Sequence, residues 1–250
     1  MEHVIILCGG KGERLRPFTE DKPKCMIPVL GNPLLALQIR LLSLHGFKKV
    51  TLCCGYKHEL IQDYFGDGSK HSVEINYLIE ETPLGRGGAL KAALSHESVP
   101  KDRPVLAMNG DIITNLSLSP VVSYHKKHKP LATIVTVPLK CDYGIIELDE
   151  SMNVSAFSEK PELPFWVNAG IYVLEPEIVD ELPDKGDHEV GTFPLLAQQG
   201  LLKAFPTQAF WKAIDTVKDL NELRDDCEQL FLQSFLQSDF APAPLATAGK

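Results

Sequence analysis

The sequence lacks a C-x-x-C pair, a long apolar run and an excess of basic side chains. None of its six cysteines has metal or redox spacing, so we expect packing cysteines in a reduced, cytosolic protein. No apolar run approaches the ~20 residues needed to cross a bilayer, and Val4–Leu7 is too short for a secretory signal. A net charge of −8 disfavours nucleic acid as a partner.

What is present is the composition of one ordinary folded domain, with 250 residues of which 44% are hydrophobic. Apolar runs alternate with amphipathic stretches, which predicts an α/β fold with a doubly wound, mostly parallel (mixed) Rossmann-like sheet and a small antiparallel insertion. We expect strands at 4–7, 50–54, 73–77, 105–108, 132–137, 145–148, 154–157, 169–174, 202–205 and 210–214. We expect helices at 33–44, 58–65, 89–95, 120–128, 176–181 and 193–199, and from 216 to about 236.

The predicted domain covers residues 1–238. Within it we expect a first part (1–137), a second part (138–215) and a C-terminal helix (216–238), followed by a disordered tail (239–250). Ligands of such sheets bind at the carboxyl ends of the strands, where the loop after residue 7, the segment near Gly85, and Asp111 all fall.

A glycine-rich loop follows the first strand. Gly9, Gly10 and Gly12 allow close backbone approach, so successive N–H groups can face a phosphate. Neither the P-loop nor the dinucleotide pattern is present, and the glycines taken alone fit a tight turn equally well. Four cations follow within a dozen residues of Gly12: Arg14, Arg16, Lys22 and Lys24. Glycines and cations together favour a triphosphate ligand.

The segments 9–17 and 22–29 resemble the signature of the sugar-1-phosphate nucleotidyltransferases, or NDP-sugar pyrophosphorylases. That pattern is roughly G-G-x-G-[ST/E]-R-L-x-P-x-T followed by x-P-K-x-M-x-P-V, and Cys25 departs from a frequent proline. The resemblance extends to about residue 225 and is nearest in look to mannose-1-phosphate or heptose-1-phosphate guanylyltransferases. It implies the nucleotide-diphospho-sugar transferase fold, with a nucleotide-binding part at 1–137 and a sugar-phosphate-binding part at 138–215.

The resemblance also implies roles for individual residues. Arg14 would bind the β- and γ-phosphates, Lys24 the α-phosphate or the sugar phosphate, and Asp111 with Asp215 would hold Mg²⁺. Read singly, either aspartate fits a local capping role as well. The implied nucleotide-binding residues are Leu7, Gly9, Gly10, Gly12, Glu13, Arg14, Lys24, Glu80, Pro83, Gly85 and Gly110. The implied sugar-phosphate-binding residues are Asp111, Gly144, Glu159, Lys160 and Asn168.

Glu80 bears on the choice of base. A carboxylate accepts two donors side by side, which guanine supplies from N1–H and N2–H₂, so the sequence favours GTP. Thymidylyl, uridylyl or cytidylyl transfer to another hexose 1-phosphate stays open. Arg86 stands where many relatives have a small residue, and the sequence gives no account of it.

We therefore expect an enzyme that uses an NTP and a sugar 1-phosphate and releases pyrophosphate, with no nucleic-acid or membrane partner. A catalytically silent regulatory subunit and a glycosyltransferase are the rival interpretations, and a homo-oligomer stays open. The chain leaves no length for a β-helix beyond its core, so acetyl transfer is not expected.

Two further pairs of side chains lack a clear role in the sequence. His125 and His128 lie among lysines, which indicates an exposed helix end rather than a metal pair. Phe165 and Trp166 fit a sugar-pocket wall or a core position equally well.

Overall fold

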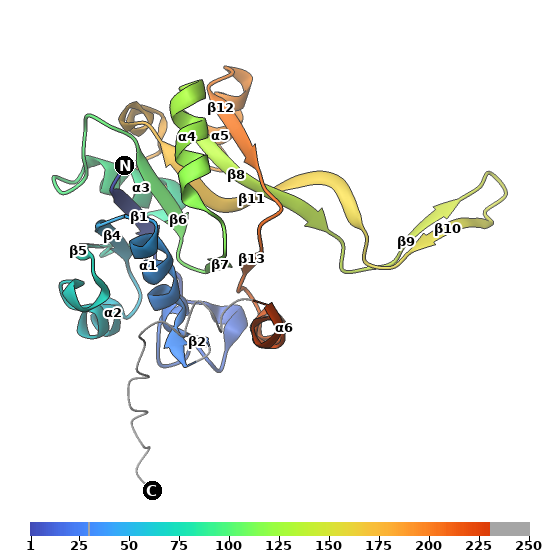
Figure 1. The fold of residues 1–250 in the computed structure, drawn as a ribbon, viewed down its shortest axis with the longest axis horizontal. Coiled ribbons are helices and arrows are strands. Elements are labelled where there is room, and N and C mark those ends of the chain that lie inside the picture. Colours follow the sequence, from blue (N-terminus) through green and yellow to red (C-terminus); the bar gives the residue numbers. More distant parts are fainter. Residues whose placement is uncertain (30, 231–250) are drawn as a thin grey trace, which may run out of the picture.

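The computed structural model describes residues 1–29 and 31–230, and a seven-stranded sheet runs through its centre (Figure 1). The strand order is β12-β8-β11-β6-β1-β4-β5. Neighbours from β6 to β5 are parallel, β12 is parallel to β8, and β11 is antiparallel to both β6 and β8. The strands are β1 (His3–Leu7), β4 (Lys49–Cys54), β5 (Glu74–Ile79), β6 (Val105–Asn109), β8 (Ala132–Lys140), β11 (Glu162–Leu174) and β12 (Leu202–Pro206). The predicted mixed α/β fold is confirmed.

Helices cover both faces of this sheet. The helices are α1 (Leu34–Leu44), α2 (His58–Phe65), α3 (Gly85–Ser95), α4 (Leu118–His128), α5 (Thr192–Gln198) and α6 (Val217–Leu230), with short 3₁₀ turns η1 (Glu13–Leu15), η2 (Lys24–Met26), η3 (Ser69–His71) and η4 (Pro176–Glu181). Strand side chains alternate between the faces, so Val4 and Ile6 pack with α1, α2 and α4, whereas Ile5 packs with α3, η4 and α5. No helix of the described residues is long and apolar enough to cross a membrane.

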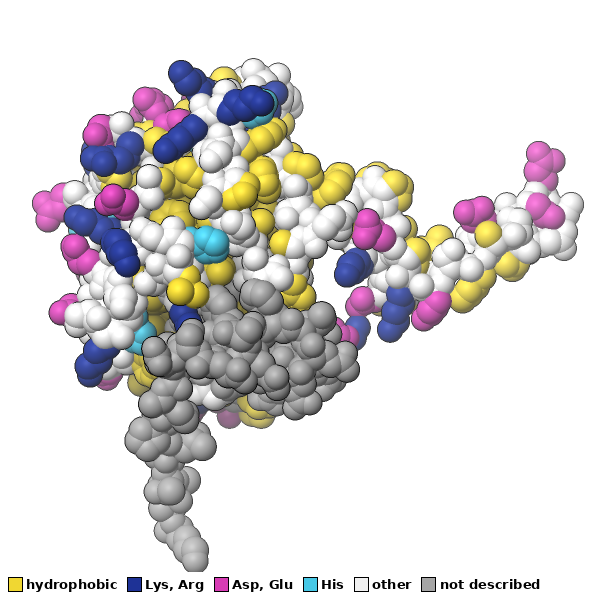
Figure 2. All heavy atoms as spheres, in the orientation of Figure 1, with side chains coloured by type: hydrophobic (Ala, Val, Ile, Leu, Met, Phe, Trp, Pro, Cys, Tyr) yellow, Lys and Arg dark blue, Asp and Glu magenta, His cyan; other side chains and the backbone are white. Residues whose placement is uncertain are grey.

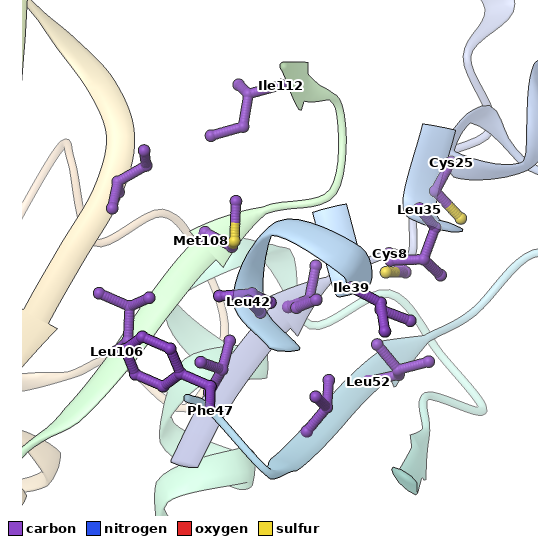
Figure 3. Close-up of a cluster of buried hydrophobic side chains, with 14 of the residues drawn as sticks. Cys8, Cys25, Leu35, Ile39, Leu42, Phe47, Leu52, Leu106, Met108 and Ile112 are labelled. Carbon is purple, nitrogen blue, oxygen red and sulfur yellow. The ribbon is translucent and has the colours of Figure 1, made fainter. Parts of the chain in front are cut away.

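The first face is a dense apolar layer. Figure 3 shows Leu35, Ile39 and Leu42 of α1 within the cluster that also contains Leu52 of β4 and Leu106 of β6. All five are fully buried, and each contributes roughly 1.5–3 kcal/mol of transfer free energy. This layer fixes the strands whose carboxyl ends carry the site.

A third, smaller cluster ties the glycine-rich loop to the C-terminal part of the described chain. Leu15 and Ile27 of the loop region are buried with Ile214 and with Leu220 of α6. Two two-stranded sheets lie in this region: β2 (Pro28–Val29) with β3 (Asn32–Pro33), and β7 (Ile112–Thr114) with β13 (Trp211–Ala213). Packing across some 200 residues of sequence therefore holds the loop in place.

The predicted antiparallel hairpin is present as β9 (Ile145–Leu148) and β10 (Val154–Ser158). Together with the outer ends of β8 and β11 it forms an arm that projects from the body (Figure 1). Ile146, Val154 and Phe157 are between 51% and 62% exposed, and apolar side chains follow the arm along its length in Figure 2. An isolated two-stranded ribbon is only marginally stable in water, so the arm depends on its base for its shape.

Two elements begin at least four residues before their predicted starts, and each has a local reason. β11 begins at Glu162 rather than 169, because its first half continues along β8 through a stretch interrupted by Pro164. α3 begins at Gly85 rather than 89, since glycines of low helix propensity form its first turn. The predicted end of the last helix at 236 and the tail 239–250 lie outside the described residues, and the proposed subdivision of the domain stays a prediction.

Candidate active site

The glycine-rich loop leaves β1 with its backbone donors unused. Within the described chain, the N–H groups of residues 9–14 donate to no protein acceptor. Unpaired backbone donors grouped in this way bind anions well. The loop therefore offers free donors where the sequence predicts phosphate binding, and that role stays a prediction.

Gly12 is the position in this loop that requires glycine. Its φ is +67°, and a Cβ would lie 2.9 Å from Thr19 Cγ2 and 3.1 Å from Lys24 Cβ. Its carbonyl oxygen accepts hydrogen bonds from Thr19 Oγ1 at 2.7 Å and from the Leu15 N–H at 2.9 Å. The turn thereby places the backbone of the loop directly against Lys24.

Lys24 joins the two predicted metal ligands. Its Nζ donates to Asp111 Oδ2 at 2.6 Å and to Asp215 Oδ1 at 2.7 Å, and its side chain is only 13% exposed. Arg14 Nη2 donates to the same oxygen of Asp215 at 2.9 Å. Four residues that the sequence singled out from three separate segments therefore meet at one point.

The carboxyl group of Asp215 is held ionised. Burial opposes its ionisation, but the hydrogen bond from Lys24 and the positive charges of Lys24, Arg14 and Arg86 outweigh that effect and lower its pKa. Asp215 also has a fixed backbone, because its N–H donates to Asp219 Oδ2 at 3.1 Å at the start of α6.

Asp111 is positioned by the end of β6. Gly110 donates its N–H to the Leu7 carbonyl at 2.9 Å, and a Cβ on Gly110 would lie 2.7 Å from that oxygen. The side chain of Gln38 donates to the carbonyls of Asn109 and Ile112 at 2.8 and 2.9 Å. These bonds hold the turn on either side of Asp111 and point to a backbone role for Gly110.

A cavity of about 480 Å³ opens beside these groups. It is lined by Arg14, Arg86, Asn109, Asp111, Ile112, Asn168, Ala169, Gly170, Glu189, Trp211, Ala213 and Asp215. Of the sugar-binding residues predicted from the resemblance, Asp111 and Asn168 line it. Glu189 was missed, because nothing in Asp187-His188-Glu189-Val190 marks that glutamate as a site residue.

The predicted base-binding segment lies next to the glycine-rich loop. Glu80 accepts the Leu84 N–H on Oε2 at 3.0 Å, and its Oε1 is 3.3 Å from the position of a Cβ on Gly9. Gly85 has φ +76°, and a Cβ there would lie 2.7 Å from the Gly186 carbonyl oxygen. Close packing against Gly186 is thus one reason for glycine at 85, independent of any base.

Gly144, Glu159 and Lys160 lie apart from this cavity, at the base of the arm. A Cβ on Gly144 would be 3.1 Å from Glu159 Oε2, so these two residues adjoin each other. The neighbouring Asp142 accepts a hydrogen bond from Lys218 of α6 at 2.8 Å, which ties the arm's base to the element after Asp215. Their predicted contacts with sugar stay predictions.

The two residue pairs without a clear role in the sequence are now placed. The prediction that His125 is exposed was wrong, because it is buried and bonds to Thr133 Oγ1 at 2.8 Å and Glu175 Oε1 at 3.1 Å. Phe165 and Trp166 are 64% and 52% exposed on β11 and belong neither to the core nor to the cavity lining.

The acidic side chains of the site suit a metal ion only together with the phosphate oxygens of a bound substrate. The described residues include no group of three or more His, Cys, Asp or Glu side chains able to hold an ion. Asp111 and Asp215 do, however, offer two carboxylates around Lys24. Mg²⁺ is commonly bound through one or two carboxylates together with substrate phosphates, so this pair fits it.

The sheet, the glycine loop and the bridged carboxylates define an α/β protein whose candidate site lies at the carboxyl ends of its strands. The chain belongs to the nucleotidyl transferase family, whose sequence profile matches residues 3–229. The resemblance seen in the sequence is therefore confirmed.

Curated relatives and a solved structure agree with this assignment. A UTP–glucose-1-phosphate uridylyltransferase of Synechocystis is 34% identical over 217 residues, covering 79% of this chain and 56% of that protein. A mannose-1-phosphate guanylyltransferase of Mycobacterium tuberculosis is 32% identical over 224 residues, covering 86% of this chain and 62% of the relative. This chain thus spans about 56–62% of the length of these two relatives.

The solved structure is that of HddC from Yersinia pseudotuberculosis. It superposes with a TM-score of 0.72 at 28% identity, covering 90% of this chain and 99% of HddC. HddC complexed with GMP-PN gives a TM-score of 0.71 at 26% identity.

Proposed function

We propose that this chain transfers a nucleotidyl group from a nucleoside triphosphate to a sugar 1-phosphate and releases pyrophosphate. The observation that carries the proposal is the position of Lys24, bridging Asp111 and Asp215 beside a loop of unused backbone donors. Two of the relatives described above are named for uridylyl and guanylyl transfer to a sugar 1-phosphate.

In the proposed reaction a phosphate oxygen of the sugar 1-phosphate attacks the α-phosphorus of the NTP. The new P–O bond forms as the bond to the β-phosphate oxygen breaks, and pyrophosphate leaves with that electron pair. Such transfers need positioning and charge neutralisation rather than a nucleophilic side chain. The N–H groups of residues 9–14 and the cation of Arg14 would bind the phosphates of the nucleotide, and Lys24 would neutralise charge near the reacting phosphorus.

We propose Mg²⁺ as the cofactor, held by Asp111 and Asp215. Asp111 Oδ1 and Asp215 Oδ2 have no donor among the described residues, so an oxygen of each carboxylate is available to an ion. When bound, the ion would offset negative charge on the departing pyrophosphate.

Among nucleotides we propose GTP, with mannose 1-phosphate or a heptose 1-phosphate as acceptor. Glu80 supports this choice, because its carboxylate lies beside Gly9 and a carboxylate can accept two donors side by side, which guanine supplies from N1–H and N2–H₂. The guanylyltransferase relative and the GMP-PN complex of HddC are consistent with it. Thymidylyl, uridylyl or cytidylyl transfer is the second candidate. We place the activity in the cytoplasm, where buried free thiols such as Cys53 and Cys54 persist.

The test is a screen for pyrophosphate release with several NTPs against a panel of sugar 1-phosphates, with and without Mg²⁺. We expect GTP with a neutral sugar 1-phosphate to give the highest turnover. No release with any pair would refute the proposal and leave the silent regulatory subunit, which would still bind a nucleotide sugar. A glycosyltransferase would release no pyrophosphate from these substrates.

Asp111→Asn tests the metal assignment. We expect it to lower kcat about 10²–10³-fold, because it removes a charged group next to the reacting phosphates. Asp21→Asn is the matched control, since Asp21 is an exposed carboxylate between η1 and η2 whose partner is Lys22. Unchanged pyrophosphate release by Asp111→Asn would contradict the assignment.

A further inference from the structure

Arg86 is held in place at the cavity by two acidic side chains. Its Nε and Nη2 donate to Asp187 Oδ1 and Oδ2, each at 3.2 Å, and its own backbone N–H donates to Asp187 Oδ1 at 3.1 Å. Nη2 also lies 2.7 Å from Glu189 Oε2. The Arg86 side chain stays 43% exposed and lines the cavity, so part of the guanidinium remains accessible to a ligand.

Glu189 extends the same network to the predicted sugar-contacting residue. Its Oε1 accepts hydrogen bonds from Asn168 Nδ2 at 2.9 Å and from the Tyr172 hydroxyl at 3.1 Å. Arg86, Asn168 and Glu189 line the same cavity as Asp111 and Asp215.

The backbone that carries Arg86 is tightly packed at the first turn of α3. A Cβ on Gly87 would lie 2.7 Å from the His188 nitrogen, and one on Gly88 would lie 2.6 Å from the Asp184 carbonyl oxygen. The Gly87 N–H donates to the Gly186 carbonyl at 2.8 Å, so the first turn of α3 is packed backbone to backbone against residues 184–188. This close packing explains why glycines stand next to Arg86, and it fixes the backbone position from which the Arg86 side chain extends.

We propose that Arg86, with Glu189, is a specificity-determining pair that binds neighbouring hydroxyls of the sugar in the acceptor sugar 1-phosphate, an inference that rests on the proposed function. A guanidinium only donates and a carboxylate only accepts, whereas each sugar hydroxyl does both. Two adjacent hydroxyls can therefore accept from Arg86 and donate to Glu189 at the same time.

The charge of the network narrows the class of sugar. One guanidinium is set against the carboxylates of Asp187 and Glu189, so the three side chains carry a net charge of −1 at neutral pH. That charge disfavours a carboxylate on the sugar. The preferred acceptor is therefore a sugar 1-phosphate whose sugar is neutral and carries adjacent hydroxyls.

The experiment measures calorimetric binding of sugar 1-phosphates and steady-state turnover for the wild type, Arg86→Ala, Arg86→Lys and Glu189→Gln. We expect Arg86→Ala and Glu189→Gln to weaken sugar-phosphate binding and raise its KM at least about tenfold, with the KM for the NTP changed less than about twofold. Arg86→Lys keeps the charge but loses the planar fork, so it should recover only part of the loss.

Lys91→Ala is the matched control. Lys91 lies on the same helix and pairs with Asp184 of the same loop at 2.7 Å, but it does not line the cavity. We expect its sugar binding to equal that of the wild type. Similar losses in Lys91→Ala and Arg86→Ala would show that Arg86 only anchors the loop, and a rise in the NTP KM alone would assign Arg86 to the nucleotide.

The two proposals fail differently. Wild-type protein that binds sugar 1-phosphates but turns over no pair would refute the proposed function, and the effect of Arg86→Ala on that binding would still decide this inference. Unchanged sugar binding and unchanged ranking of neutral and carboxylated sugars in Arg86→Ala would overturn it.

Discussion

Lys24 holds together two carboxylates that would otherwise repel each other. Asp111 and Asp215 each lie within 2.7 Å of its Nζ, and Arg14 adds a second cation on Asp215. Charged groups this close interact strongly in a partly buried site. One side chain therefore sets both the geometry and the ionisation of the site.

Lys24→Met is expected to lower kcat/KM by at least about 10²-fold and to raise the pKa of Asp215, because the hydrogen bond and charge of Lys24 lead the effects that lower it. Pyrophosphate release measures the first effect. Lys22→Met is the control, since Lys22 lies two residues before Lys24 and pairs with the exposed Asp21. Comparable activity of the two variants would contradict the role of Lys24.

Gly12→Ala is expected to destabilise the protein by roughly 1–3 kcal/mol, because a Cβ must adopt φ +67° and meets Thr19 and Lys24 within 3.1 Å. Gly10→Ala is the matched control, as a Cβ at Gly10 meets nothing within 4 Å. Thermal unfolding compares the two variants, and equal melting temperatures would contradict the strain at Gly12.

At the scale of residues, the sequence predicted the charged side chains that belong to recognisable motifs. Lys24, Asp111 and Asp215 meet as expected, since their motifs follow predicted strands or precede a predicted helix. Arg86 was noticed but not explained, because its partner Asp187 lies 101 residues away. His125 was placed wrongly for the same reason, since its partner Glu175 is 50 residues distant.

At the scale of elements, periodicity and capping predicted well what local chemistry determines. Thr216 begins the last helix as expected: the Asp219 N–H donates to Thr216 Oγ1 at 3.2 Å, and Asp219 Oδ2 accepts the Thr216 N–H at 2.7 Å. Pairing between distant segments was beyond the sequence. β7 pairs with β13 across nearly 100 residues, and neither short strand specifies its partner.

Thr216→Val is expected to cost about 1 kcal/mol of stability by removing the cap, and to raise the KM of the nucleotide because Asp215 precedes it directly. Thr216→Ser retains the hydroxyl and should stay close to the wild type. Chemical denaturation and initial rates measure the two effects. A Thr216→Val protein with wild-type stability would show that the cap does not hold the helix start.

At the scale of the whole molecule, two buried histidines couple folding to pH. His188 packs edge-on against Tyr172 and Phe193 with centroids 5.3 and 4.7 Å away, and burial, aided by the charge of Arg86, lowers its pKa to about 4. Burial, aided by the charge of Lys49, likewise lowers the pKa of His3 to about 4. Both side chains fold in their neutral form.

Between pH 6.5 and about 4 the unfolded chain therefore binds more protons than the folded chain, so stability falls as the pH falls through that window. For His188 a shift of this size corresponds to roughly 3 kcal/mol when complete. His188→Phe keeps an aromatic ring in the cluster and should flatten the fall, which denaturation at several pH values measures. A variant that loses stability in parallel with the wild type down to pH 4 would contradict the assignment.

The arm is the large-scale feature that the sequence did not predict. Its hairpin was expected, but alternation alone does not say whether a ribbon lies on the body or leaves it. Nor did composition place Phe165 and Trp166, whose exposure follows from the path of β11 beyond the sheet. The direction of the arm depends on the lengths of β8 and β11. Both strands extend further toward the arm than the sequence predicts, β8 to Lys140 and β11 from Glu162.

The buried apolar cluster between the glycine-rich loop and α6 affects the order in which parts of a nascent chain can fold. Lys24 leaves the ribosome 191 residues ahead of Asp215, and Leu15 and Ile27 are buried only when Ile214 and Leu220 arrive. The main sheet can pair once Pro206 has emerged from the ribosome, since its last strand ends there. Contacts of such sequence separation form late, so the sheet can pair before the site around Lys24 is complete. A nascent chain that has emerged only as far as about residue 207 would thus display a paired sheet in which Arg14 and Lys24 still lack Asp215.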